Sequence, residues 1–121
     1  MGATSYRELE VWAKAMDVAQ EIYVVVEMMP KREEYRLTAQ IIRAAVSIPA
    51  NIAEGHARAT RRDYAHFISI ARGSAAELET LLILAERAKH LPAHLPQPLL
   101  EQVESVSRML NRLHTRLRDA P

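Results

Sequence analysis

Apolar residues recur every three or four positions along four stretches of the chain, a spacing typical of helices that bury one face. The first stripe consists of Leu9, Trp12, Met16, Ala19, Tyr23 and Val26. The second consists of Leu37, Ile41, Ala44 or Ala45, Ile48 and Ile52. No stretch alternates with the period of two that marks a half-buried strand. The sequence therefore predicts an all-α protein.

Two further stripes complete the pattern. The third follows Thr60, a good N-cap residue, and consists of Tyr64, Phe67, Ala71, Leu78, Leu81, Ala85 and Ala88. The fourth follows Pro98, which suits a first helical turn, and consists of Leu99, Val103, Val106, Leu110, Leu113 and Leu117. The connections at 30–33, 55–60 and 89–97 are short, which favours antiparallel neighbours. We expect one antiparallel, up-down-up-down four-helix bundle spanning residues 1–121.

A proline lies inside the second predicted helix. Pro49 lacks the N–H that an uninterrupted helix requires, so a helix that passes through it is expected to kink. Ile48 and Ile52 keep the apolar stripe in phase on both sides of the proline. We therefore expect helix two to continue through Pro49 with a bend.

Composition excludes several kinds of chemistry. The 121 residues include no cysteine, which rules out disulfides and thiolate metal sites, and only three glycines, too few for a phosphate-binding glycine loop. His90 and His94 are separated by Pro92, so helical metal-ligand spacing is not expected there. No membrane-spanning or signal segment is evident. We expect a cytoplasmic protein without enzymatic activity, cofactor, metal site or membrane partner.

A second, polar stripe accompanies the apolar one on helix two: Gln40, Arg43, Ser47, Asn51, Glu54 and Arg58. Helix three carries small and polar residues that match it: His66, Ser69, Gly73, Ser74, Ala76, Glu77 and Thr80. We interpret them as a polar network at a helix or subunit contact, with Gly73 permitting a close approach and a buried Arg43 paired with Glu54, Glu77 or Glu79. Two solvated faces are the alternative interpretation.

Basic residues gather in two places, and 13 of the 16 are arginines. Arg58, Arg61 and Arg62 occupy the predicted turn between helices two and three. Arg108, Arg112 and Arg116 form a ridge on helix four. Such clusters can neutralise phosphates, although a net charge of only +1 also fits a solvated face. Aromatic residues are scarce, so any contact would be to the nucleic-acid backbone rather than to its sequence.

Three segments, residues 9–17, 37–55 and 70–80, resemble the signatures of a known family. It consists of four-helix bundle proteins encoded in intervening sequences of bacterial large-subunit ribosomal RNA. The resemblance covers roughly residues 6–90 in the right order, and departs where Ala13 replaces the glutamine that often follows the tryptophan. It implies a homo-oligomer, a pentamer of bundles, with no enzyme activity and no established biochemical role.

Carried over position by position, the characteristic polar residues of the family fall on Gln40, Arg43, Ser47, Asn51, Glu54, Gly73, Ser74, Glu77 and Glu79. A looser resemblance links the chain to the accessory protein of diversity-generating retroelements, which partners a reverse transcriptase and binds nucleic acid. The resulting hypothesis is a non-enzymatic oligomeric bundle that binds RNA or DNA through its basic clusters. The alternative is a protein-interaction adaptor that binds no nucleic acid.

Overall fold

Four long helices make up most of the computed structural model, which describes residues 4–119. They are α1 (Glu10–Val25), α2 (Leu37–His56), α3 (Arg61–Arg87) and α4 (Pro96–Asp119). Short 3-10 turns are η1 (Tyr6–Glu8), η2 (Val26–Met28) and η3 (Lys31–Glu33). No strand occurs within residues 4–119. The prediction of an all-helical chain with four long helices is confirmed.

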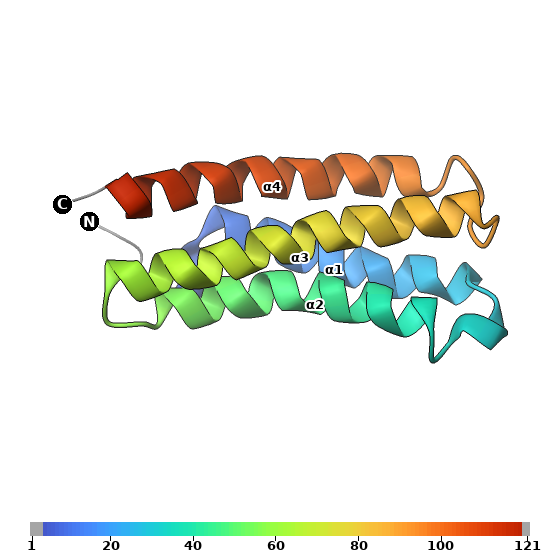
Figure 1. Cartoon of the computed structure of the whole chain (residues 1–121), viewed down its shortest axis with the longest axis horizontal. Helices are drawn as coiled ribbons and strands as arrows, with labels where there is room; N and C mark the ends of the chain where they lie inside the picture. Colours follow the sequence, from blue (N-terminus) through green and yellow to red (C-terminus); the bar gives the residue numbers. More distant parts are fainter. Residues whose placement is uncertain (1–3, 120–121) are drawn as a thin grey trace.

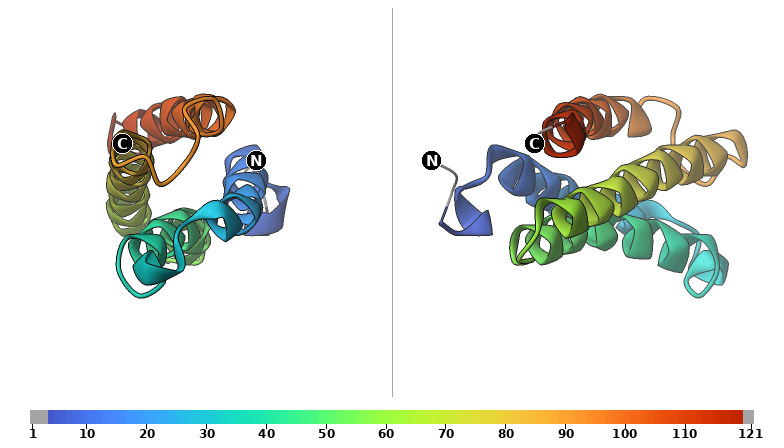
Figure 2. Two further views of the ribbon diagram at one scale, coloured as in Figure 1. Left: turned by 90° about the vertical axis from the view of Figure 1, so that its right-hand side faces the viewer. Right: turned by 60° about the vertical axis from the view of Figure 1, so that its left-hand side comes forward.

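The helices lie lengthwise beside one another, and their colour order in Figure 1 reverses direction from each helix to the next. The view along the long axis in Figure 2 shows them around a common centre in the order α1, α2, α3, α4. Contacts are most extensive between α2 and α3, followed by α3 and α4, and are least extensive between α1 and α4. One end of the molecule therefore holds the start of α1, the α2–α3 turn and the end of α4.

Side-chain and backbone caps fix where the helices begin and end. The Thr60 hydroxyl oxygen accepts a hydrogen bond from the Asp63 N–H (3.1 Å), as the sequence predicts for the start of α3. The Glu33 carboxylate accepts from the Leu37 N–H at the start of α2 (3.3 Å). At the end of α3, Lys89 has a φ of 61°, and the His90 N–H reaches back to the Ala85 carbonyl oxygen (2.9 Å). This left-handed residue ends the helix and starts the connection to α4.

Helix α2 continues through Pro49, whose side chain is buried. Proline has no N–H to donate to the carbonyl four residues earlier, and yet the helix extends to His56. The expectation that α2 does not end at the proline is therefore correct.

The core lies between the four helices and includes most of the predicted stripes of α2 and α4. On α3 the prediction is only partly confirmed, since Tyr64 and Phe67 are half-buried and Ala88 is exposed, whereas Ile68 and Leu82 are buried outside the predicted stripe. The largest fully buried aliphatic residues of the core include Ile22, Ile41, Ile48, Ile52, Ile68, Leu78, Leu82 and Leu110. Burying such a side chain stabilises the fold by about 1.5–3 kcal/mol. Leu113 of the predicted α4 stripe is half-buried, and the other members are buried.

The predicted core stripe of α1 is only partly confirmed: Ala19 and Val26 are buried, and Leu9 and Trp12 are half-buried against the core. Met16 and Tyr23 are 43% and 55% exposed. The buried face of α1 consists of Val11, Ala15, Val18, Ile22 and Val25, together with Ala19 of the predicted stripe. These residues also follow a three-four spacing, so α1 carries two apolar stripes side by side. Met16 and Tyr23 of the predicted stripe therefore lie on the outside of the bundle.

Candidate nucleic-acid interface

Arg58 is held against the α2–α3 turn by two contacts. Its Nη2 lies 2.7 Å from the Glu54 Oε2, and its guanidinium carbon lies 4.6 Å from the centre of the Phe67 ring. The ion pair joins side chains one helical turn apart, and both are substantially exposed. The Arg58 charge is thus partly compensated within the chain.

Arg61 connects the two basic clusters that lie far apart in the sequence. Its Nη2 donates a hydrogen bond to the carbonyl oxygen of Arg116 in the last turns of α4 (3.2 Å). The start of α3 and the end of α4 therefore meet at one end of the bundle (Figure 1). We call residues 58–62 and 108–118 together the basic end. These two segments contain seven arginines and no acidic residue.

The arginines of the basic end differ in whether an acid compensates them. Arg108 Nη1 lies 2.9 Å from Glu104 Oε1, and Arg118 Nε lies 3.1 Å from Asp119 Oδ1. Within residues 4–119, no carboxylate oxygen lies within 4 Å of a charged nitrogen of Arg61, Arg62, Arg112 or Arg116. All four side chains are exposed. Their positive charges are therefore available to bind an anionic ligand.

Two further basic groups belong near this end, and the sequence analysis missed both. Arg72 lies in a shallow groove between α3 and α4, together with Ser69, Gly73, Ser107 and Asn111. His114 is half-buried beside α3. Its pKa is lowered from its ordinary value, first by burial and then by the Arg72 and Arg118 cations, which outweigh the opposite effect of Asp119. The segment that contains Arg72 matches the third family signature, and this was the available signal.

Tyr64 lies beside the α2–α3 turn, where its ring packs edge-on against His56 with centroids 5.8 Å apart. Burial raises the pKa of Tyr64, and the Arg116 cation opposes this shift. The phenol is therefore neutral at physiological pH. Because half of the Tyr64 side chain is covered, it supports the turn rather than offering a ring for base stacking.

Part of the predicted polar network forms between α2 and α3. The Ser47 and Ser74 hydroxyl oxygens lie 2.8 Å apart, and Ser74 is buried. The Asn51 Nδ2 donates to the Ser47 carbonyl oxygen (2.8 Å) and to the Ser47 hydroxyl oxygen (2.9 Å). These three side chains form a hydrogen-bonded cluster between α2 and α3. The structure therefore brings together Ser47, Asn51 and Ser74.

The predicted burial of Arg43 is wrong for the single chain. Arg43 and Glu77 are exposed, and within residues 4–119 Arg43 makes no ion pair with any of its predicted partners. Both sit at the outer edge of the α2 and α3 faces that meet at Ser47 and Ser74. Gln40 and Glu54 are exposed as well, and Glu79 is half-buried. The interpretation of these residues as a subunit contact stays a prediction.

Gly73 does not serve a close approach between helices of the same chain, so the subunit contact is the part of its predicted role that stays a prediction. A Cβ added there would meet no atom within 4 Å. The close approach occurs instead at Gly55, where an added Cβ would lie 3.2 Å from the Tyr64 carbonyl oxygen. The glycine that the packing of α2 against α3 requires is therefore Gly55.

Neither a metal-binding site nor a membrane-spanning helix occurs in the part of the chain that the structure describes. Residues 4–119 contain no group of three or more His, Asp or Glu side chains arranged to hold a metal ion. Among those residues, too, no helix has the length and apolar character needed to cross a bilayer.

Comparison with known proteins points to one family. Residues 7–112 match the family described as "23S rRNA-intervening sequence protein". A solved structure from Bacteroides thetaiotaomicron, described as a protein with unknown function from the S23 ribosomal protein family, is similar with a TM-score of 0.80. The two chains are 24% identical, and the similarity covers 86% of this chain and 97% of that one. None of the curated proteins compared matches the chain.

Proposed function

The chain belongs to the family of 23S rRNA-intervening sequence proteins, and from this premise we propose that it is a non-enzymatic, self-assembling bundle that binds RNA or DNA in the cytoplasm through its basic end. The unit of the assembly is an antiparallel, up-down-up-down bundle whose second helix bends at Pro49. The observation that carries the proposal is the Arg61–Arg116 hydrogen bond, because it joins the two basic clusters into one continuous surface.

Phosphate binding follows from the charges of this surface. Arg61, Arg62, Arg112 and Arg116 are exposed and have no acid within ion-pair distance among residues 4–119. The planar guanidinium group of arginine matches the geometry of phosphate. Contacts of this kind go to the nucleic-acid backbone, so they favour binding with strong salt dependence and little sequence preference.

Self-assembly is supported by the outward-facing apolar stripe of α1 and its neighbour α2. Met16, Tyr23 and Val46 are each more than 40% exposed. Met16 and Tyr23 lie two turns apart on one face of α1, and a continuous exposed apolar surface is typical of one that another protein covers. A ring of five copies would repeat the basic end once per subunit. Weak phosphate contacts would then add up to a useful avidity.

The test combines sizing with a mobility shift. Light scattering at micromolar concentration is expected to show a species larger than a dimer, and mixed-sequence RNA and DNA should bind at low salt and less at moderate salt. Replacing Arg58, Arg61 and Arg62 by glutamate should abolish binding and leave the assembly intact. The matched control replaces Lys31, Arg32 and Arg87 at the opposite end of the bundle, and it should bind nearly as the parent does.

The alternative function is a protein adaptor, which the exposed apolar residues of α1 and α2 also favour. An assembled protein that binds neither RNA nor DNA at low salt, where electrostatic attraction is greatest, would support the adaptor. A stable species of about 13.7 kDa, the mass of one chain, would exclude self-assembly.

A further inference from the structure

A cavity of about 230 Å³ opens between the start of α1 and the last turns of α4. These two helices have the least extensive contacts of any neighbouring pair in the bundle. The cavity is lined by Leu9, Glu10, Val11, Met109, Arg112, Leu113 and Arg116. It therefore adjoins the basic end and includes two of its uncompensated arginines.

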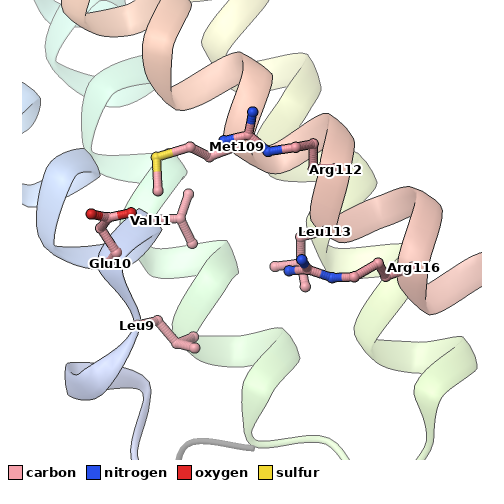
Figure 3. Close-up of a pocket in the computed structure, with 7 residues that line it drawn as sticks. All are labelled: Leu9, Glu10, Val11, Met109, Arg112, Leu113 and Arg116. Carbon is pink, nitrogen blue, oxygen red and sulfur yellow. The ribbon is translucent and has the colours of Figure 1, made fainter.

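The lining divides into three chemical parts, which Figure 3 shows together. Leu9, Val11, Leu113 and Met109 provide apolar surface. The guanidinium groups of Arg112 and Arg116 extend from α4 toward the α1 side of the opening. Glu10, in the first turn of α1, carries the one carboxylate of the lining. A cavity that combines apolar side chains with two cations and one acceptor suits a flat, polar-edged ring that is attached to an anion.

Glu10 remains available as an acceptor. Its side chain is exposed, and neither of its carboxylate oxygens lies within 4 Å of an arginine nitrogen among the described residues. Arg112 and Arg116 likewise have no acidic partner there. The three charges thus line one opening without neutralising each other in ion pairs. Each is free to contact a ligand.

We propose that this cavity accepts one unstacked guanine base of a single-stranded nucleic acid. Glu10 accepts hydrogen bonds from the N1–H and the 2-amino group of the base, and Arg112 and Arg116 bind the phosphates on either side of it. The inference rests on the proposed function, because the same arginines belong to the basic end. It adds a base preference to a surface that otherwise recognises only the backbone.

The volume of the cavity and the hydrogen-bond donors of the base both favour guanine. A volume of about 230 Å³ is smaller than the ~300–1,000 Å³ of pockets for drug-sized ligands, and it suits a single ring system. An ionised carboxylate only accepts hydrogen bonds and can accept two in parallel. Guanine offers two adjacent donors on its Watson–Crick edge, whereas uracil offers one donor between two carbonyl oxygens. Single-stranded bases present these edges when they are splayed out of the stack.

Contacts to the faces of the base come from groups other than aromatic rings. The Met109 thioether can pack against the ring. Leu9 and Leu113 are half-buried, so part of their apolar surface faces the cavity. A base that enters covers this surface, and the phosphates remain outside with the arginines.

The test uses three twelve-residue RNA oligonucleotides: one of uridine only, one with a central guanosine and one with a central inosine. Inosine keeps the N1–H of guanosine but lacks the 2-amino group. Fluorescence anisotropy of the unmodified 121-residue chain should give the tightest binding for guanosine, weaker binding for inosine and the weakest for uridine. We expect roughly tenfold between guanosine and uridine, the effect of one hydrogen bond to a charged group.

Variants of Glu10 separate base recognition from general electrostatics. Glu10→Ala removes both acceptor oxygens and should abolish the preference for guanosine, whereas Glu10→Gln keeps one neutral acceptor and should retain part of it. Loss of a negative charge alone would raise the affinity for all three oligonucleotides equally. The matched control is Glu21→Gln, which removes an exposed acid elsewhere on α1 and should leave the guanosine preference unchanged.

Two outcomes overturn the base site, and they differ from failure of the proposed function. Equal affinity of the parent protein for all three oligonucleotides, or a guanosine preference that survives Glu10→Ala, would show that the cavity does not read the base. The proposed function would then still stand, because backbone binding persists. Absence of binding to any of the three at low salt would overturn both.

Replacing Arg112 and Arg116 together by glutamine should weaken binding to all three.

Discussion

Gly55 on α2 lies against Phe67 on α3 so closely that an added Cβ would come within 2.9 Å of the Phe67 Cβ. The same Cβ would lie 3.0 Å from the Tyr64 Cδ1 and 3.2 Å from the Tyr64 carbonyl oxygen. Since the carbonyl belongs to the backbone of α3, it cannot rotate away as a side-chain end can. Glycine at position 55 therefore sets how closely the two best-packed helices approach near their turn.

Gly55→Ala is expected to destabilise the protein by about 1–3 kcal/mol, because the added methyl group forces α2 and α3 apart. The matched control is Gly73→Ala, at the other helical glycine, where an added Cβ meets nothing within 4 Å. This control should stabilise the single chain by up to ~1 kcal/mol, since alanine favours helix over glycine. Urea unfolding measures both. Equal effects of the two substitutions would contradict the packing argument.

Arg43→Ala and Glu77→Ala provide a test of the polar faces. If the two residues belong to a buried network, as the sequence predicts, each substitution should lower the stability by roughly 2–4 kcal/mol, because a buried charge would lose its partner. Exposure of both residues instead predicts a change within ~0.5 kcal/mol for the isolated chain. Thermal melting and light scattering of both variants distinguish these two expectations. A large loss of stability that accompanies loss of the oligomer would place these residues in a subunit contact.

Arg112→Gln and Arg108→Gln should weaken nucleic-acid binding unequally. Arg108 is paired with Glu104 at 2.9 Å, whereas Arg112 has no acid within 4 Å among the described residues. We expect Arg112→Gln to reduce the slope of log affinity against log salt by about one. Arg108→Gln should reduce it less, because part of its charge is already neutralised. Titrations of a mixed-sequence duplex at four salt concentrations measure this. Identical slopes for the two variants would refute the ranking.

His114 should lower the stability of the protein as the pH falls. Burial and the nearby Arg72 and Arg118 cations lower the pKa of His114 in the folded chain, so the unfolded chain binds this proton more tightly. Stability from this residue is present above its unfolded pKa of about 6.5 and is lost as the pH drops through the folded value. His114→Gln should therefore lose less stability between pH 7 and pH 5. His94→Gln, in the exposed α3–α4 connection, is the control.

Much of the fold could be predicted from apolar spacing, but α1 shows its limit. The stripes predicted on α2 and α4 enter the core almost entirely, whereas α3 also carries apolar residues on its exposed side, among them Ile70, Ile83 and Leu84. On α1 the stripe of Val18 and Ile22 and the stripe of Met16 and Tyr23 fit the same period. Spacing alone cannot say which enters the core. Only packing against α2 and α4 decides it.

The candidate site was partly predictable for a similar reason. The sequence identified the arginines of both clusters, since charge spacing is a local property. It did not reveal that Arg61 and Arg116 touch, or that Glu10 and Met109 line one cavity, because these contacts depend on how α1, α3 and α4 are placed. It also overestimated the buried network, since it could not tell that Arg43 lies at the outer edge of its helix.

Three contacts along the α2–α3 hairpin suggest the order in which it closes. Gly55 meets Phe67 beside the turn, Ser47 meets Ser74 midway, and Glu33 meets His90 at the open end, where the Glu33 Oε2 and His90 Nε2 lie 3.8 Å apart. Each step outward closes a longer loop, and every doubling of loop length costs about 0.6 kcal/mol more. A hairpin that nucleates at its turn would form these contacts in this order. Substitutions at Gly55 would then slow folding, whereas substitutions at Glu33 would mainly speed unfolding.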